Sequence, residues 1–186
     1  MSVRPAGVAD ALAIEAIRVR GWRAAYRHVF PPAELDALPV DETRWRNRLE
    51  KPPAGWAVFV ADEGETVTGF AALGPSRDER GVGELYAIYV DPSAWGSGVG
   101  RALIAEAEAA LGARWDEATL WVLEDNPRAR RFYERAGWAP DGAQKAEERL
   151  GVAAVEVRYR KSLGARGLKA PRAATDASGG GARPRN

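Results

Sequence analysis

The chain has 186 residues, of which 46% are hydrophobic and 28% charged, and its formal net charge is +1, as is typical of one globular domain. It contains no cysteine, which excludes disulfides, thiolate metal sites and a cysteine nucleophile. No stretch approaches the about 18 apolar residues of a membrane span, and the N-terminal segment lacks the apolar core of a signal peptide. We therefore expect a cytoplasmic protein with no membrane partner.

The first half of the chain predicts one strand, three helices and then three strands. A short strand at 2–4 precedes a helix over 8–26, whose apolar residues recur with helical spacing. Two prolines end that helix and open a short one over 31–38, and a third helix follows over 42–50. The pattern then changes to β-rich runs separated by turn residues, at 56–62, 66–74 and 83–90.

The second half alternates helices with strands. After Val90 the chain passes through a glycine-rich loop into a helix over 101–111 and then a strand over 118–123. A helix over 126–137 has clear ends, since Asn126 caps it and Gly137 terminates it. The last strand, 153–161, alternates Val155, Val157 and Tyr159 with Glu156, Arg158 and Arg160. This order predicts a mixed α/β domain over residues 1–163 with a mostly antiparallel sheet.

The C-terminal segment 164–186 differs from the rest in charge and composition. Five Arg or Lys residues and one Asp give it a net charge of +4, which leaves the rest of the chain at −3. Gly, Pro, Ala and Ser dominate it, so it cannot bury enough apolar surface to order itself. We expect a solvated, disordered basic tail, with contact to nucleic acid as the less favoured interpretation.

Gly96, Gly98 and Gly100 occupy every second position directly before a helix. Glycine permits positive φ, and the N–H groups of such a loop, with those of a helix's first turn, form an anion-binding nest. We interpret the loop as a diphosphate site to which Arg101 adds charge; a turn that serves packing alone is the alternative. The segment lacks the Lys-Ser/Thr of a P-loop and the G-x-G-x-x-G spacing of a dinucleotide fold.

The runs "ELYAIY", "VDPSAWGSGVGRALI" and "LWVLEDNPRARRFYERAGW" resemble the GNAT superfamily of acyl-CoA-dependent N-acyltransferases. The resemblance is specific over residues 84–138 and follows the element order over 1–163. It implies a central, mostly antiparallel sheet flanked by helices, acetyl-CoA as co-substrate and no metal. One position departs from the family, which has Gln or Arg where this chain has Trp95. We expect Trp95 to cover the ligand or to pack under the loop.

The resemblance also implies how the cofactor binds. The strand ending at Val90 would splay from its neighbour at a bulge, so that free backbone groups pair with the pantetheine arm and one amide donates to the thioester carbonyl. Asn126 would help to hold that arm, unless it serves as a helix cap alone. The implied cofactor-binding residues are Ile88, Tyr89, Val90, Gly96, Ser97, Gly98, Val99, Gly100, Arg101 and Asn126.

Two residues are candidates for proton transfer. Tyr133 falls where the family keeps a tyrosine near the cofactor sulfur, and a phenol, with a pKa of about 10, stays protonated and can donate to the leaving thiolate. A role as a core aromatic beside Phe132 is the alternative. Glu84 opens the strand before the bulge, where family members often carry the carboxylate that deprotonates the amine; a solvated glutamate is its alternative. Without a cysteine, direct attack in a ternary complex is favoured.

The acceptor site is less defined by the sequence. Trp22 and Tyr26 share a helix face and are substrate candidates, with Trp45 beside them, although all three also suit the core. Glu34 or Asp36 is a candidate to meet a cationic amine, and His28, the only histidine, suits either a helix end or catalysis. We predict an acetyl-CoA-dependent N-acetyltransferase for a small-molecule amine. The alternatives are a protein N-terminal or lysine acetyltransferase and a non-catalytic acyl-CoA sensor. Nucleic acid is not an expected partner, and a homodimer is left open.

Overall fold

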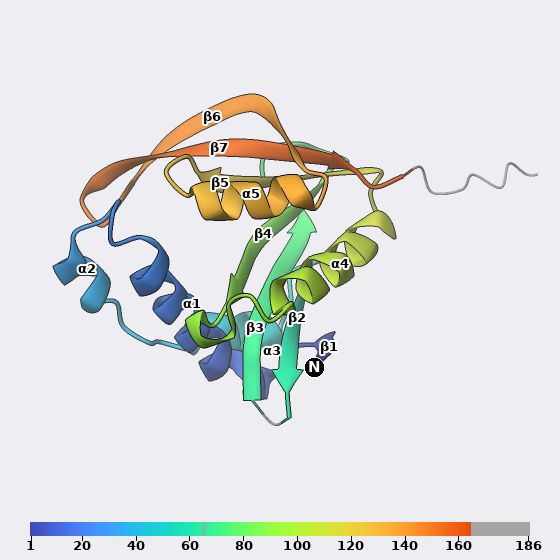
Figure 1. Cartoon of the computed structure of the whole chain (residues 1–186). Coiled ribbons are helices and arrows are strands. Elements are labelled where there is room, and N and C mark those ends of the chain that lie inside the picture. The colour runs from blue at the N-terminus through green and yellow to red at the C-terminus, as the bar shows by residue number, and fades with distance from the viewer. Residues whose placement is uncertain (65, 165–186) are drawn as a thin grey trace, which may run out of the picture.

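One sheet runs through the protein, and helices cover both of its faces in the computed structural model, which describes residues 1–64 and 66–164 (Figure 1). The predicted tail lies outside the described residues apart from Gly164. The strands are β1 (Ser2–Pro5), β2 (Ala57–Glu63), β3 (Thr66–Pro75), β4 (Gly83–Val90), β5 (Glu117–Leu123), β6 (Ala139–Arg149) and β7 (Val152–Ser162). The helices are α1 (Ala11–Ala25), α2 (Pro32–Asp36), α3 (Thr43–Glu50), α4 (Val99–Gly112) and α5 (Pro127–Arg135), with 3-10 turns η1 (Val8–Asp10) and η2 (Pro92–Ala94).

The described strands follow the order β1-β2-β3-β4-β5-β7-β6. Every neighbouring pair is antiparallel except β4 and β5, which run parallel because α4 connects them as a crossover. The mixed α/β class and the mostly antiparallel sheet predicted from the sequence are therefore confirmed.

Alternating residues of β3 fill two separate cores. Ala71 and Leu73 face α4 in a cluster that also contains Val99, Leu103 and Leu111. Phe70 and Ala72 point the other way, into a cluster with α1 and α3. The period-2 alternation of the strand explains how one run of apolar residues stabilises both faces.

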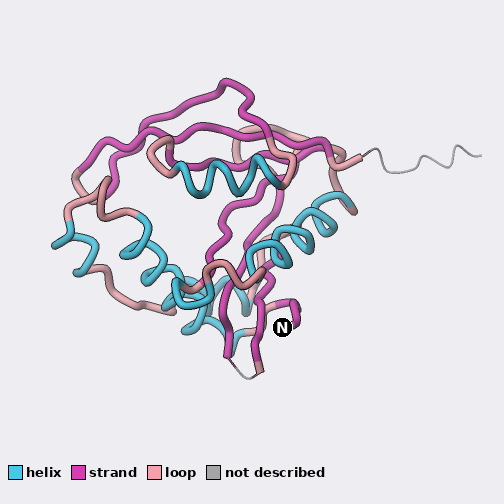
Figure 2. Tube along the Cα trace, viewed as in Figure 1, coloured by secondary structure: helices cyan, strands magenta, loops and turns pink. Residues whose placement is uncertain are grey.

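The β6–β7 hairpin arches over one end of the sheet and reaches the α1–α2 region (Figure 2). A third cluster holds it there: Phe30 and Leu35 pack with Ala154, and the partly buried Leu150 and Val152 of the hairpin join them. The hairpin turn is therefore fixed against the N-terminal helices.

Strand β6 is the element that the sequence prediction missed. Its residues "APDGAQKAEER" combine Pro and Gly with residues that favour helices. It pairs on one side only, with β7, and most of it is exposed or half-buried. An edge strand of this kind lacks the apolar alternation that identifies a buried strand.

The helices in the described ranges all fall short of what a bilayer crossing requires in length and apolar character.

Candidate active site

β4 and β5 pair only at their first residues and then diverge. Their register joins Gly83, Glu84 and Leu85 of β4 to residues 118–120 of β5 and extends no further along the described strands. On its other edge β4 stays paired with β3, apart from a bulge at Tyr86. The edge of β4 from Tyr86 to Val90 therefore lacks a strand partner. This is the splay and the bulge that the resemblance implies.

A cleft of about 900 Å³ occupies the space between the diverging strands. Its walls come from α1, β4, the loop before α4, α5 and the β6–β7 hairpin. Figure 2 shows the course of α5 above that loop. The cleft contains Tyr133, Trp22, Tyr26 and the predicted cofactor-binding residues except Ser97 and Val99, whereas Glu84, Trp45 and His28 do not line it. Val99 is fully buried in the core, and the Ser97 hydroxyl donates to the Ala94 carbonyl at 2.7 Å.

The glycine loop has the geometry of an anion-binding nest. Gly96 and Gly98 have φ angles of 87° and 99°, which other residues rarely adopt, and a Cβ at either position would meet no atom within 4 Å. Backbone conformation, and not packing, requires glycine at both. The first helical hydrogen bond of α4 runs from Ala102 N to Gly98 O at 3.1 Å, so the N–H groups of residues 99–101 are available to a ligand.

Gly100 lies at a narrow point of the cleft. A Cβ there would sit 3.3 Å from Cε2 of Phe132 on α5 and 3.6 Å from Cγ2 of Val90. A side chain at this position would bring the two walls into steric conflict, so glycine keeps the passage open.

Trp95 adopts an arrangement that combines a backbone contact with a contact across the cleft. Its indole Nε1 donates to the Val90 carbonyl at 2.9 Å, and the Arg128 guanidinium lies 3.6 Å from its ring centroid. The Val90 carbonyl is therefore occupied, which corrects the expectation that all backbone groups of residues 88–90 are free. Trp95 packs beside the loop and links it to α5.

Tyr133 projects from α5 into the cleft and is 7% exposed. Its ring packs edge-on against Phe132 and near Tyr159, while its hydroxyl forms no hydrogen bond to any other described residue. Burial raises the pKa of Tyr133 above the ordinary value for a phenol, and Tyr89 adds to the effect. The side chain thus combines the packing of a core aromatic with a protonated hydroxyl that is free to donate.

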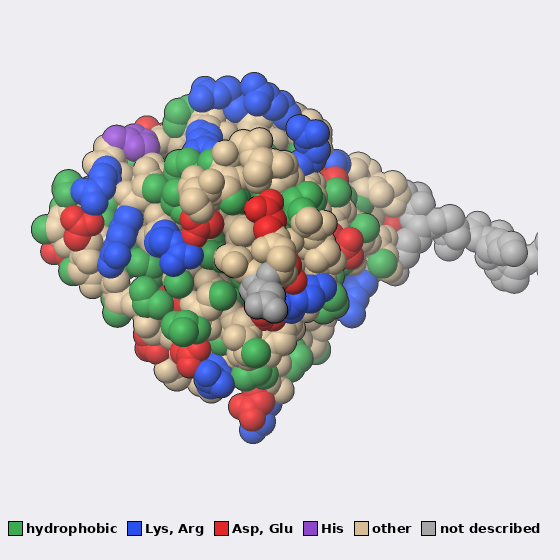
Figure 3. All heavy atoms as spheres, turned by 60° about the horizontal axis from the view of Figure 1, so that its bottom comes forward, with side chains coloured by type: hydrophobic (Ala, Val, Ile, Leu, Met, Phe, Trp, Pro, Cys, Tyr) green, Lys and Arg blue, Asp and Glu red, His purple; other side chains and the backbone are tan. Residues whose placement is uncertain are grey.

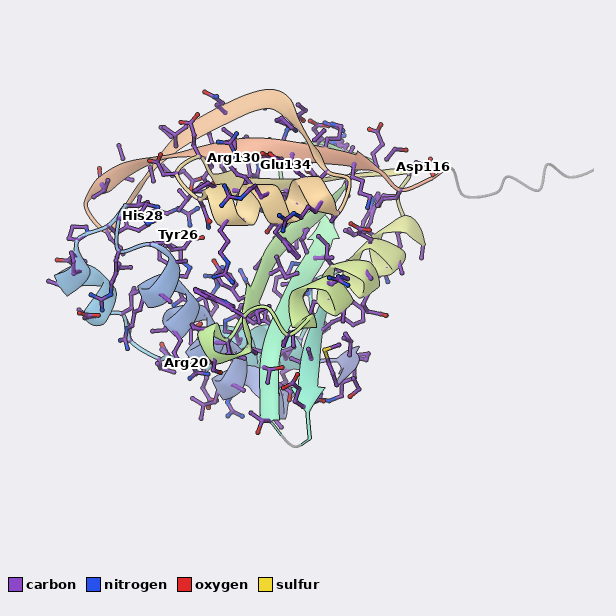
Figure 4. The ribbon with its side chains drawn as sticks, viewed as in Figure 1. Arg20, Tyr26, His28, Asp116, Arg130 and Glu134 are labelled. Atoms are coloured by element: carbon purple, nitrogen blue, oxygen red, sulfur yellow. The ribbon has the colours of Figure 1, made fainter. Side chains whose placement is uncertain are left out.

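Asn126 connects α5 with the end of α1 across the cleft. As the cap of α5 its Oδ1 accepts from Ala129 N at 3.0 Å, and its Nδ2 points to the Tyr26 hydroxyl at 3.4 Å. Tyr26 projects from the end of α1 toward α5 (Figure 4), and Trp22 lies one turn earlier and donates to the Tyr89 hydroxyl at 2.8 Å. Burial raises the pKa of Tyr26. Both substrate candidates line the cleft.

The structure does not bring Glu84 to this cleft. Its side chain is fully buried at the start of β4 and pairs with Arg77 of the β3–β4 loop, whose guanidinium and backbone N–H both donate to it. Glu84 therefore forms a buried ion pair outside the cleft. Its role as the base stays a prediction.

Glu156 and Arg149 line the cleft at the β6–β7 hairpin, and the sequence analysis did not name either as a site residue. Glu156 is 8% exposed and forms ion pairs with Arg149 at 3.1 Å and with Lys145 at 3.3 Å. It is the one carboxylate among the described cleft residues. The sequence could not indicate this ion pair, because both cationic partners of Glu156 belong to β6, the strand that was not predicted.

Three other candidates lie elsewhere. Trp45 is buried in the core beneath α3, where its indole donates to Glu15 at 2.9 Å. His28, at the surface (purple in Figure 3), contacts the Asp125 carbonyl at 2.7 Å and does not line the cleft. Asp36 pairs with Arg27 at 2.7 Å on the exposed surface. The described residues contain no group of three or more acidic or histidine side chains arranged to hold a metal ion.

Comparison with known proteins identifies the relatives of this fold. Residues 19–138 match the acetyltransferase (GNAT) family. An uncharacterized N-acetyltransferase of Bacillus subtilis, YuaI, is 35% identical over 164 residues, which cover 85% of this chain and 89% of YuaI. A mycothiol acetyltransferase of Kineococcus radiotolerans is 36% identical over 108 residues, 55% of this chain and 35% of that protein, so this chain spans about a third of its length.

Among solved structures, YncA of Salmonella typhimurium, determined with its cofactor acetyl-CoA, superposes with a TM-score of 0.71 at 23% sequence identity. The match covers 96% of this chain and 99% of YncA, and at that identity it supports the fold.

Proposed function

Because the chain belongs to the GNAT family of acetyltransferases, we propose that it transfers the acetyl group of acetyl-CoA to the primary amine of a small molecule. The enzyme is an acetyl-CoA-dependent N-acetyltransferase; the chemical class of the acceptor is the proposed part. The observation that carries the proposal is the cleft between β4 and β5, which has phosphate donors at one end and an aromatic chamber at the other.

The cofactor end suits a diphosphate followed by an extended arm. The N–H groups of residues 99–101 and the positive-φ glycines would hold the diphosphate, with Arg101 beside them. The unpaired edge of β4 before Val90 would bind the pantetheine amides as a neighbouring strand would. When bound, acetyl-CoA supplies the activated acetyl group.

Tyr133 is the proposed general acid. Attack by the amine nitrogen forms the C–N bond, breaks the C–S bond and leaves a thiolate that needs a proton. Since burial holds the pKa of Tyr133 above its ordinary value, the phenol carries a proton throughout the neutral range, and its hydroxyl has no competing partner among the described residues. The proton released by the amine restores the phenol through water.

Glu156, which is already paired with Arg149 and Lys145, is the carboxylate that an incoming cationic amine would meet in the described part of the cleft. An amine enters mostly as ammonium at neutral pH, and this carboxylate lines the chamber formed by Trp22, Tyr26 and Arg149. We propose that Glu156 orients the amine before it loses its proton.

A small acceptor fits the chamber better than a polypeptide does. The β6–β7 turn closes this end of the molecule, because Leu150 and Val152 pack against the α1–α2 cluster around Phe30 and Leu35. An extended peptide would have to displace this contact, whereas a small amine would not.

The test is a panel of acceptors offered with acetyl-CoA, in which free coenzyme A is measured. The panel pairs amino acids, polyamines and aminoglycosides with peptides that carry a free N-terminus or a lysine. Turnover confined to small amines and lowered by Glu156→Gln supports the proposal. Turnover on peptides alone contradicts the acceptor class, and tight binding of coenzyme A without turnover on any amine supports a sensor instead.

A further inference from the structure

Four arginines line the cleft without a countercharge. Arg101 belongs to the first turn of α4, and Arg128, Arg131 and Arg135 belong to α5. None of the four forms an ion pair with a carboxylate in the described part of the chain. Most arginines of the neighbouring β6–β7 hairpin do, as Arg149, Arg158 and Arg160 show. The cleft thus presents positive charge that the described protein itself does not neutralise.

The three arginines of α5 that line the cleft form one narrow row. At about 100° per residue, positions 128, 131 and 135 fall within about 60° of arc. Arg130 and Glu134 lie about 100° and 60° from Arg131 around the helix, toward β7 (Figure 4), and bind the Tyr159 hydroxyl at 3.1 and 2.8 Å. Charges that face the sheet are therefore paired, whereas the row that borders the cleft is not.

The position of Arg128 is unfavourable for the isolated helix, whereas Arg135, in the last turn, lies where the helix dipole favours a cation. Arg128 occupies the first turn of α5, where the positive end of the helix dipole disfavours a cation. Like charges three and four positions apart also repel along the row. A locally unfavourable arrangement that borders a cleft is typical of a site for a polyanion.

The row lies on the wall of the cleft that faces the glycine loop. Arg128 reaches the Trp95 ring, with its guanidinium 3.6 Å from the ring centroid, and Phe132, adjacent to the row, approaches Gly100. Arg128 therefore stands opposite the diphosphate nest, while Arg131 and Arg135 lie further along α5. The loop N–H groups and Arg101 already suit a diphosphate, so the rest of the row has capacity for another phosphate.

We propose that Arg131 and Arg135 bind the ribose 3′-phosphate of coenzyme A, and that the enzyme thereby selects cofactors that carry this group. The inference rests on the proposed function, since it assumes that the diphosphate occupies the loop. A phosphate monoester carries about −1.5 to −2 charge at neutral pH, which two guanidinium groups match.

The test compares coenzyme A with 3′-dephospho-coenzyme A by isothermal titration calorimetry, without an acceptor amine. The wild-type protein should bind coenzyme A about 10- to 100-fold more tightly, which is less than two buried charge-assisted contacts would give because both arginines are exposed. The Arg131→Gln/Arg135→Gln protein should bind the two ligands within about threefold of each other and retain wild-type affinity for the dephospho form. The matched control, Arg80→Gln/Arg114→Gln, removes the same charge from exposed sites outside the cleft and should keep the wild-type preference.

Each outcome bears on a different step. Equal wild-type affinity for both ligands, or an equal loss of both in the Arg131→Gln/Arg135→Gln protein, overturns the 3′-phosphate site and leaves acetyl transfer untouched. Loss of preference in the control protein shows that overall charge, and not this row, is responsible. Absence of binding to either ligand overturns the proposal together with the diphosphate site on which it rests.

Discussion

Replacement of Tyr133 by phenylalanine separates its two roles. The ring packs against Phe132 and Tyr159, but the hydroxyl has no partner among the described residues, so the free energy of unfolding should change by less than about 0.5 kcal/mol. Loss of a general acid should lower kcat by about 10²- to 10⁴-fold, or about 2.7–5.4 kcal/mol in activation free energy. Steady-state kinetics with the best acceptor of the amine panel and urea unfolding measure the two quantities.

Tyr159→Phe is the matched control, because it removes a buried phenol outside the cleft. The Tyr159 hydroxyl accepts from Arg130 Nε at 3.1 Å and donates to Glu134 at 2.8 Å, so its loss should destabilise the protein by about 1–2 kcal/mol and leave kcat unchanged. An unchanged kcat in Tyr133→Phe, or a similar loss of stability in both variants, would show that Tyr133 is a packing residue and refute the assignment.

Three further predictions follow from single contacts. Gly98→Ala and Gly142→Ala each place a Cβ at a positive φ with open space around it. Each substitution should lower the free energy of unfolding by about 1 kcal/mol. Only Gly98→Ala should abolish the thermal shift given by coenzyme A. Arg77→Ala leaves the fully buried Glu84 carboxylate without its guanidinium and should lower the free energy of unfolding by about 1–3 kcal/mol in urea titrations; no change would mean that water replaces the pair. Burial raises the pKa of Tyr89 above that of the unfolded chain, so the stability it contributes is complete below about pH 10 and declines above it, which urea titrations at pH 8 and pH 10.5 would reveal.

The parts of the site that the sequence predicted are those encoded by local chemistry. Positive φ explains Gly96 and Gly98, and a side-chain cap explains Asn126, since each depends on neighbours within a few residues. Gly137, with φ of 83°, ends α5 for the same reason. These features appear in the sequence as residue types at fixed spacing, so they could be placed before the fold was known.

The acceptor side depends on contacts between distant segments. Alternation along the last strand predicts Val155 on the buried face, yet Val155 is 38% exposed and Glu156 is 8% exposed. The reason is that β7 is covered on different faces along its length: Ala154 and Glu156 face the α1–α2 end, whereas Val157 and Tyr159 pack toward α5. Alternation with a period of two residues cannot predict burial along a strand whose buried face changes. The cations that pair with Glu156 come from an edge strand that lacks apolar alternation.

Trp95 shows how a departure from a family pattern is explained by a contact from another element. The family carries Gln or Arg at this loop position, and a tryptophan there removes a polar group from the diphosphate site. The structure places a guanidinium on that tryptophan from the opposite wall, because Arg128 stacks on the ring while the indole N–H is fixed to the Val90 carbonyl. A flat ring anchored at one edge restricts where the guanidinium can lie, so a cation from α5 stands beside the loop where the family has a polar side chain on the loop itself. Trp95→Gln should then restore the family's polar side chain but release Arg128, and its effect on affinity for coenzyme A should depend on whether Arg128 is present, which a double-mutant cycle with Arg128→Gln measures. Additive effects of the two substitutions would show that Trp95 and Arg128 act independently.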